Sequence, residues 1–279
     1  MKKLAASFVL ALAIYQPFVP GDAYSIPVLP DFNGSQFLPG APINNPYFPL
    51  LDFNTRVFVS RQEGEENRFE LQVVGAGPNI LGVQTTARRD RAFEGGLLVE
   101  DTFDYYAQDK AGNVWYFGED VTNYLYDDAG NLIGTNNASA WRAGVNDAKP
   151  GFIMPADLIL GFNYYQEFAE DDEALDQGTT FGFKNHVSVE FGDFSDVLQV
   201  LETSELDPDA REFKYYAPDQ GLILAEEGLD DDFKHPQETF ELARESAPIP
   251  EPATIMLLGL GLAGIAGIGA RKKKVMEKS

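Results

Sequence analysis

Cysteine is absent from the 279 residues, and histidine occurs only as His186 and His235. The absence of cysteine excludes disulfides, thiol catalysis, cysteine metal sites and the lipid attachment of bacterial lipoproteins. The scarcity of histidine argues against a histidine metal site and against a Ser-His-Asp triad. No G-x-S-x-G, P-loop or H-E-x-x-H pattern occurs. The sequence therefore predicts no catalytic residue, no required cofactor and no recognisable enzyme.

Basic residues are also scarce, since 21 Lys and Arg stand against 44 Asp and Glu, for a net charge of −23. An acidic surface repels nucleic acid and anionic lipid, so nucleic acid is excluded as an expected partner. The aromatic fraction of 13% argues against disorder despite this charge.

Both ends of the chain have the pattern of targeting segments. Lys2 and Lys3 precede an apolar run at residues 4–14, and small residues follow up to Ala23. This order is typical of a secretory signal peptide at residues 1–23, with cleavage after Ala23. We therefore expect the mature chain to be exported.

At the other end, residues 253–270 carry no charge. As a helix of ~1.5 Å per residue they would extend ~27 Å, enough to cross a bilayer core. Four basic residues follow and should remain in the cytoplasm: Arg271, Lys272, Lys273 and Lys274. Pro250, Glu251 and Pro252 precede the apolar run, and the two prolines keep this segment extended and accessible to a protease.

The order of residues 250–279 closely resembles the PEP-CTERM sorting signal of Gram-negative bacteria. The resemblance implies a protein that is held transiently in the inner membrane, cut near Pro250-Glu251-Pro252 by an exosortase, and released to the cell surface or extracellular matrix. It also implies an association with exopolysaccharide and biofilm. Two inner stretches, residues 112–119 and 215–222, resemble segments of uncharacterised secreted bacterial β-proteins.

Between the two signals we expect a mainly β protein. Residues 24–50 are rich in proline and predict an extended arm that covers the main domain. Residues 51–227 alternate short β-branched or aromatic runs with turn formers, including Asp109–Asn113 and Asp127–Asn131, which share the form Asp-x-Ala-Gly-Asn. This pattern predicts one antiparallel meander, with a partly open barrel favoured and a two-sheet sandwich as the alternative. Residues 228–249 are interpreted as an acidic stalk with a short helix opened by Pro236.

Two groups of side chains are candidate binding residues. Carboxylates of one acidic loop predict a calcium site: Glu170, Asp171, Asp172 and Asp176. Rings in adjacent aromatic pairs predict an exposed row that stacks on sugars: Tyr106, Trp115, Tyr165 and Tyr216. A solvated loop and covered rings are the respective alternatives.

The function expected from these observations is binding or structure at the cell surface. Two alternatives stay open at this point: a secreted hydrolase acting on polysaccharide, which needs paired carboxylates across a cleft, and a carrier of a small molecule or lipid, which needs a cavity inside the barrel.

Overall fold

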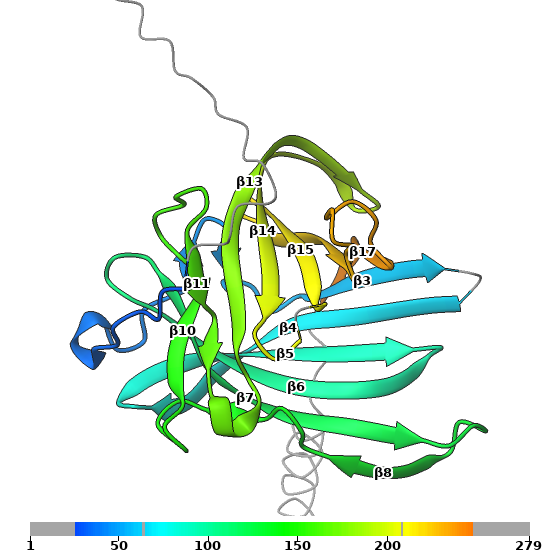
Figure 1. The fold of residues 1–279 in the computed structure, drawn as a ribbon, viewed down its shortest axis with the longest axis horizontal. Coiled ribbons are helices and arrows are strands. Elements are labelled where there is room, and N and C mark those ends of the chain that lie inside the picture. The colour runs from blue at the N-terminus through cyan, green and yellow to red at the C-terminus, as the bar shows by residue number, and fades with distance from the viewer. Residues whose placement is uncertain (1–25, 63–64, 208, 248–279) are drawn as a thin grey trace, which may run out of the picture.

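The structure, a computed structural model, describes residues 26–62, 65–207 and 209–247 (Figure 1). Almost all of the regular structure in these residues is β. The longer strands are β3 (Thr55–Gln62), β4 (Glu65–Ile80), β5 (Val83–Glu94), β6 (Leu97–Gln108), β7 (Val114–Tyr126), β13 (Asp176–Val189), β14 (Gly192–Ser204), β15 (Arg211–Ala217), β16 (Gly221–Glu227) and β17 (Glu238–Ser246). The shorter elements are η1 (Gly34–Gln36), β1 (Asn44–Asn45), β2 (Phe48–Pro49), β8 (Leu132–Asn136), β9 (Trp141–Arg142), β10 (Lys149–Met154), β11 (Asn163–Tyr165), β12 (Glu167–Phe168) and η2 (Glu170–Asp172).

One large antiparallel sheet contains every strand except β1 and β2, which pair with each other. The strand order is β11-β13-β14-β15-β16-β17-β3-β4-β5-β6-β7-β10-β12, and β8 and β9 also pair with β7. Most neighbours in this order are also neighbours in the sequence, as short turns between strands require. The predicted antiparallel meander is confirmed.

The sheet curls until its two ends nearly meet. Residues 163–168 connect the ends, because β11 pairs with β13 on one side while β12 pairs with β10 on the other. Gly151 of β10 lies so close to this segment that a Cβ there would be 2.1 Å from the backbone oxygen of Tyr165. Only glycine permits that approach. The favoured fold, a partly open barrel, is confirmed, and the sheet is nearly closed.

The interior of the sheet follows from the two-residue period of the strands. In β16, for example, Gly221, Ile223 and Ala225 are buried while the residues between them are partly exposed. Two hydrophobic clusters result, one around β6 and β7 and one around β14 to β17.

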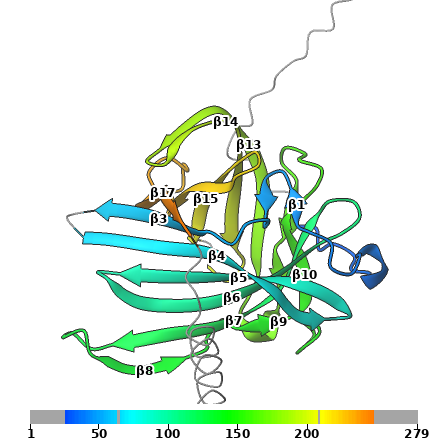
Figure 2. The same ribbon diagram turned by 180° about the vertical axis from the view of Figure 1, so that it is seen from behind.

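The Pro-rich arm packs against the first of these clusters, and Figure 2 shows it in blue on the side of β10. Phe37 meets Trp115 with ring centroids 5.8 Å apart, and Phe48 of β2 meets Tyr106 at 5.2 Å. Leu38 stays 56% exposed. The arm covers the barrel, as its apolar residues predict.

Two hairpin turns have the structure that their sequence predicts. In the turn between β6 and β7, Asp109 Oδ1 accepts hydrogen bonds from the backbone N–H groups of Ala111 and Asn113. Asp127 plays the same part between β7 and β8. The Asp-x-Ala-Gly-Asn form is thus a local turn signal that occurs twice.

The prediction of an acidic stalk with a short helix at residues 228–249 is wrong. Residues 238–246 form β17, which lies inside the sheet between β16 and β3. Phe240 and Leu242 alternate with partly exposed residues and pack into the core, so the strand is buried on one face. The β domain therefore extends to residue 246.

Several predicted segments lie outside the described residues: the signal peptide at 1–23, the Pro-Glu-Pro motif, the apolar helix at 253–270 and the basic stop. Within residues 26–62, 65–207 and 209–247, no helix is both long and apolar enough to cross a bilayer.

Candidate functional site

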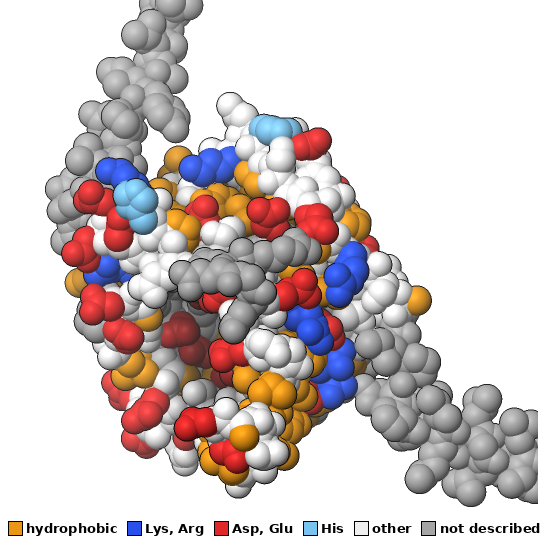
Figure 3. Space-filling model, turned by 90° about the vertical axis from the view of Figure 1, so that its right-hand side faces the viewer, with side chains coloured by type: hydrophobic (Ala, Val, Ile, Leu, Met, Phe, Trp, Pro, Cys, Tyr) orange, Lys and Arg blue, Asp and Glu red, His pale blue; other side chains and the backbone are white. Residues whose placement is uncertain are grey.

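A cavity of about 310 Å³ opens inside the curled sheet. Residues of β4, β5 and β6 form one wall, residues of β14 to β17 form the other, and Phe48 of the arm and Ile153 of β10 also line the cavity. Figure 3 views the molecule from the end where β3 and β4 are joined, and acidic side chains surround a hollow on this face. The lining combines aromatic and aliphatic groups with charged ones.

Strand alternation decides which charges of β5 point inward. Arg88 and Asp90 line the cavity. The alternate residues of the strand, Arg89 and Arg91, do not line it. Arg89 instead pairs with Asp101 at 2.6 Å, and Arg91 pairs with Glu70 at 2.7 Å. One strand thus supplies both the interior charges and a row of ion pairs outside the cavity.

Arg88 is held by a buried polar network. Its Nη2 donates to Asp104 Oδ2 at 2.9 Å and to the Tyr106 hydroxyl at 2.8 Å. Asp104 also accepts a hydrogen bond from the Tyr116 hydroxyl, at 2.9 Å. Buried charges are stable only when they are paired in this way, so Arg88 is fixed rather than available.

Glu119 extends this network, because its Oε2 lies 3.0 Å from the same Tyr116 hydroxyl. Burial, reinforced by the nearby Asp104 and Glu167, raises the pKa of Glu119 to about 9. Burial also raises the pKa of Glu167 to about 8. Both carboxyls are therefore protonated at neutral pH.

Lys214 on the opposite wall is the centre of a second network. Its Nζ lies 2.8 Å from Glu202 Oε2 and 3.1 Å from Glu212 Oε1. Gln166 donates a further hydrogen bond to Glu202 at 2.7 Å. Burial, opposed by Lys214 and reinforced by Glu202, raises the pKa of Glu212 to about 8. The two glutamates share one lysine, and only one of them needs to be ionised.

Asp90 differs from these charges. It lines the cavity, yet no hydrogen bond or ion pair to its side chain occurs in the described part of the chain. Burial raises the pKa of Asp90 to about 7, although Arg88 opposes the shift. The cavity therefore contains a carboxyl whose protein surroundings provide no direct partner.

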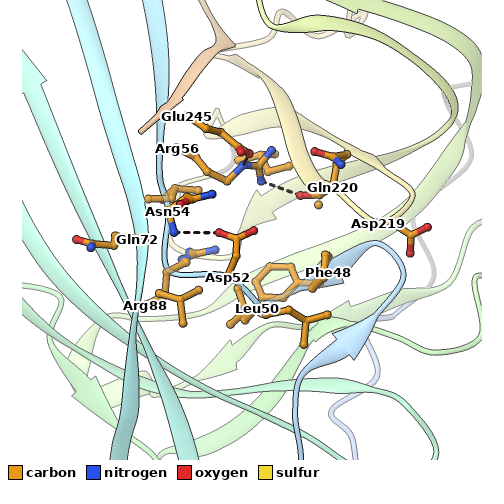
Figure 4. A pocket seen from close by; sticks show the side chains of 16 residues that line it. Phe48, Leu50, Asp52, Asn54, Arg56, Gln72, Arg88, Asp219, Gln220 and Glu245 are labelled. Carbon is orange, nitrogen blue, oxygen red and sulfur yellow. Dashed lines mark hydrogen bonds and ion pairs between the residues drawn. The ribbon is translucent and has the colours of Figure 1, made fainter. Parts of the chain in front are cut away.

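A second cavity, also of about 310 Å³, lies beneath the arm (Figure 4). Arg56 and Glu245 pair across its wall at 3.1 Å, and Arg56 Nη1 donates to the backbone oxygen of Gln220 at 2.8 Å. Phe48 and Arg88 line both cavities. The Phe48 ring, which packs between Tyr106 and Tyr216, therefore lies between the two spaces.

The predicted calcium ligands follow one another along an exposed turn. Glu170, Asp171 and Asp172 form η2, and Asp176 begins β13. Among the described residues, no group of three or more His, Asp or Glu is arranged to hold a metal ion. Asp172 Oδ1 accepts a hydrogen bond from Asn146 at 3.2 Å. A calcium site in this loop stays a prediction.

The four predicted sugar-binding rings do not form an exposed row. Tyr106, Trp115 and Tyr216 are only 2%, 1% and 3% exposed, because the arm and the curled sheet enclose them. Tyr165 alone is partly exposed, and its hydroxyl donates to Glu205. The expectation of an exposed aromatic face is corrected for three rings, and sugar contact at Tyr165 stays a prediction.

Sequence reasoning missed the charged interior. A signal was present, because the hairpin around Gly95 and Gly96 places Arg88 directly opposite Asp104. An opposed Arg–Asp pair is common on solvent faces too, so the register alone did not show which face is inside.

Comparison with known proteins assigns the C-terminal segment. Residues 248–274 match the family described as the PEP-CTERM protein-sorting motif. No curated protein matches the chain. A crystal structure from Bacteroides fragilis, described as an exported protein with a YMCC-like fold, is similar with a TM-score of 0.37 and 13% identity, covering 72% of this chain and 98% of that one. A structure from Parabacteroides distasonis, described as a lipoprotein, gives a TM-score of 0.35, 13% identity and the same coverages of 72% and 98%.

The family match includes Pro250, Glu251 and Pro252, the apolar run and the four basic residues, so it confirms the resemblance drawn from those residues. The chain carries a PEP-CTERM sorting motif, which implies an exported protein that is processed by an exosortase.

Proposed function

We propose that this protein is an extracellular binding protein that holds a small ligand inside its curled sheet. In this proposal the tail spans the inner membrane with its basic end in the cytoplasm, an exosortase cuts near Pro250-Glu251-Pro252, and the β domain is released to the cell surface or extracellular matrix. Binding, rather than catalysis, is the proposed activity.

The observation that carries the proposal is the interior cavity of about 310 Å³. Small-molecule sites are typically concave, mostly apolar and equipped with a few polar groups that orient the ligand. Phe69 and Phe240 give this cavity aromatic walls, and Arg88 and Lys214 with their ion-pair partners give it polar groups in fixed positions. It therefore meets the condition that the carrier alternative requires.

The burial of the predicted sugar-binding rings favours this proposal over a matrix protein that binds polysaccharide. A matrix protein that stacks on exopolysaccharide would use an open aromatic face, but Tyr106, Trp115 and Tyr216 are buried. In this proposal the released domain lies among exopolysaccharide or biofilm polymer, but its cavity does not bind that polymer.

Native mass spectrometry of the domain purified from its own host tests the proposal. We expect a non-covalent adduct that disappears on denaturation. Replacing Ala92, which lines the cavity, by tryptophan should fill the space and remove the adduct. The matched control is Ala129→Trp in the exposed turn between β7 and β8, which should keep it. A wild-type domain without any adduct would contradict the proposal.

A further inference from the structure

We infer that the cavity inside the sheet selects an organic cation with an apolar body, whose charged group lies against Asp90. The inference rests on the proposed binding function and adds the class of ligand. It follows from how the charges of the cavity wall are already paired.

The basic groups of the wall are neutralised by the protein itself. Arg88 pairs with Asp104 at 2.9 Å, and Lys214 pairs with two glutamates. Arg68 pairs with Glu70 at 3.1 Å and stacks over the Phe93 ring at 3.7 Å from its centroid. An anionic ligand would have to displace one of these internal partners.

The acidic groups of the wall are in excess. Among the described residues that line the cavity, six are acidic and three are basic. Asp90 and Glu227 belong to the acidic set, and the ion pairs of the described chain include neither of them. The uncompensated charge inside the cavity is therefore negative, and it attracts a cation.

Asp90 is the group best placed to receive that cation. It accepts no hydrogen bond in the described chain, and burial raises its pKa to about 7, although Arg88 and Lys214 nearby oppose the shift. An ammonium group beside it would supply both the hydrogen bond and the charge. The neighbouring apolar walls, including Phe69, Phe240 and Leu222, would cover the rest of the ligand.

Three probes of the same shape separate charge from apolar contact: 4-phenylbutylamine, 4-phenylbutanol and 4-phenylbutyrate. Calorimetric titration of the wild-type domain is done at pH 8, where Asp90 is ionised. It should show that the amine binds most tightly, the alcohol less tightly and the carboxylate most weakly. Asp90→Asn should lower the affinity for the amine about ten-fold, which is the scale of one charged hydrogen bond. The affinity for the alcohol should not change. The matched control, Asp128→Asn, removes the same charge in the exposed β7–β8 turn and should change nothing.

The outcomes distinguish this inference from the function on which it rests. Tighter binding of the carboxylate than of the amine, or equal binding of the amine by wild type and Asp90→Asn, would overturn the cationic class while leaving a ligand-binding cavity in place. Failure of all three probes to bind would overturn the inferred ligand class, and the native mass spectrum would then decide whether a ligand of another class occupies the cavity.

Discussion

The hydroxyl oxygen of Tyr116 lies 3.0 Å from Oε2 of Glu119, and the same hydroxyl is 2.9 Å from Oδ1 of Asp104. A tyrosine hydroxyl has one hydrogen to donate. Asp104 is already paired with Arg88, and its Oδ1 accepts that hydrogen. Burial raises the pKa of Glu119 to about 9, so this carboxyl carries a proton at neutral pH that it can donate to the tyrosine oxygen. The geometry and the raised pKa of Glu119 agree on a carboxyl that is neutral in the folded protein.

The stability of the domain should fall as the pH rises from about 5 to about 8. The folded-state pKa is about 9 for Glu119 and about 8 for Glu167 and Glu212. In the unfolded chain glutamate titrates near ~4.3. Above that pH the unfolded state releases protons that the folded state keeps, so the free energy of unfolding decreases with pH. Thermal melts at pH 5, 6.5 and 8 should show a falling Tm, and a Tm that rises over this range would contradict the assignment.

Glu119→Gln should weaken this pH dependence. Glutamine keeps a donor for the Tyr116 oxygen but has no proton to lose, so the variant should melt above the wild type at pH 8 and close to it at pH 5. Asp128→Asn, on the exposed turn between β7 and β8, is the control and should follow the wild type at every pH. Identical melting curves for Glu119→Gln and wild type would show that Glu119 does not carry the effect.

Lys214→Met should destabilise the domain by about 3–5 kcal/mol. The change leaves Glu202 and Glu212 close together without their shared cation, and an unpaired buried charge has a cost of this order. Lys234→Met is the matched control, because the Lys234 side chain is 67% exposed, and its effect should be near zero. Urea denaturation monitored by tryptophan fluorescence measures both. Equal midpoints would contradict the buried network.

Phe48→Ala should destabilise the domain by about 3–5 kcal/mol, the usual cost of truncating a buried phenylalanine. Phe48 is 5% exposed and lies between the two cavities, so its loss should also join them. Leu38→Ala in the same arm serves as the control, since Leu38 is 56% exposed and should cost little. Urea denaturation compares the two variants. If both have the same urea midpoint as the wild type, the arm does not stabilise the folded domain.

Much of the fold could be predicted because its signals are local. The Asp-x-Ala-Gly-Asn turns and the short alternating runs around Trp115 and Tyr215 are read within a few residues of each other. The strand β17 could not be predicted in the same way, because its partner β3 is at the other end of the domain. Glu238, Glu241 and Glu245 also give the segment the acidic composition that is typical of a solvated stalk. The alternating Phe240 and Leu242 were the available signal.

The candidate cavity could not be predicted from composition. Arg88, Asp90 and Lys214 are residue types that normally face water, and only the closure of the sheet places them inside. The tail is the opposite case, since Pro250 to Lys274 form a linear signal that needs no fold to be recognised.

Glu251→Ala should leave the protein uncut in the membrane, because the residue is the glutamate of the Pro-Glu-Pro segment within the matched sorting motif. Glu173→Ala, in the exposed turn before β13, removes the same side chain outside the motif and should be released normally. Fractionation of membranes and medium, followed by immunoblotting, compares the two. Normal release of Glu251→Ala would contradict processing at this motif.

The decisive measurement of exosortase release is the intact mass of the protein from washed membranes and from extracellular material of the native host. We predict a membrane form that ends at Ser279 and an extracellular form that begins near Tyr24 and ends near Pro250. A chain ending at Ser279 in every fraction would contradict release, and the acidic β domain would then belong to a protein that stays at the inner membrane.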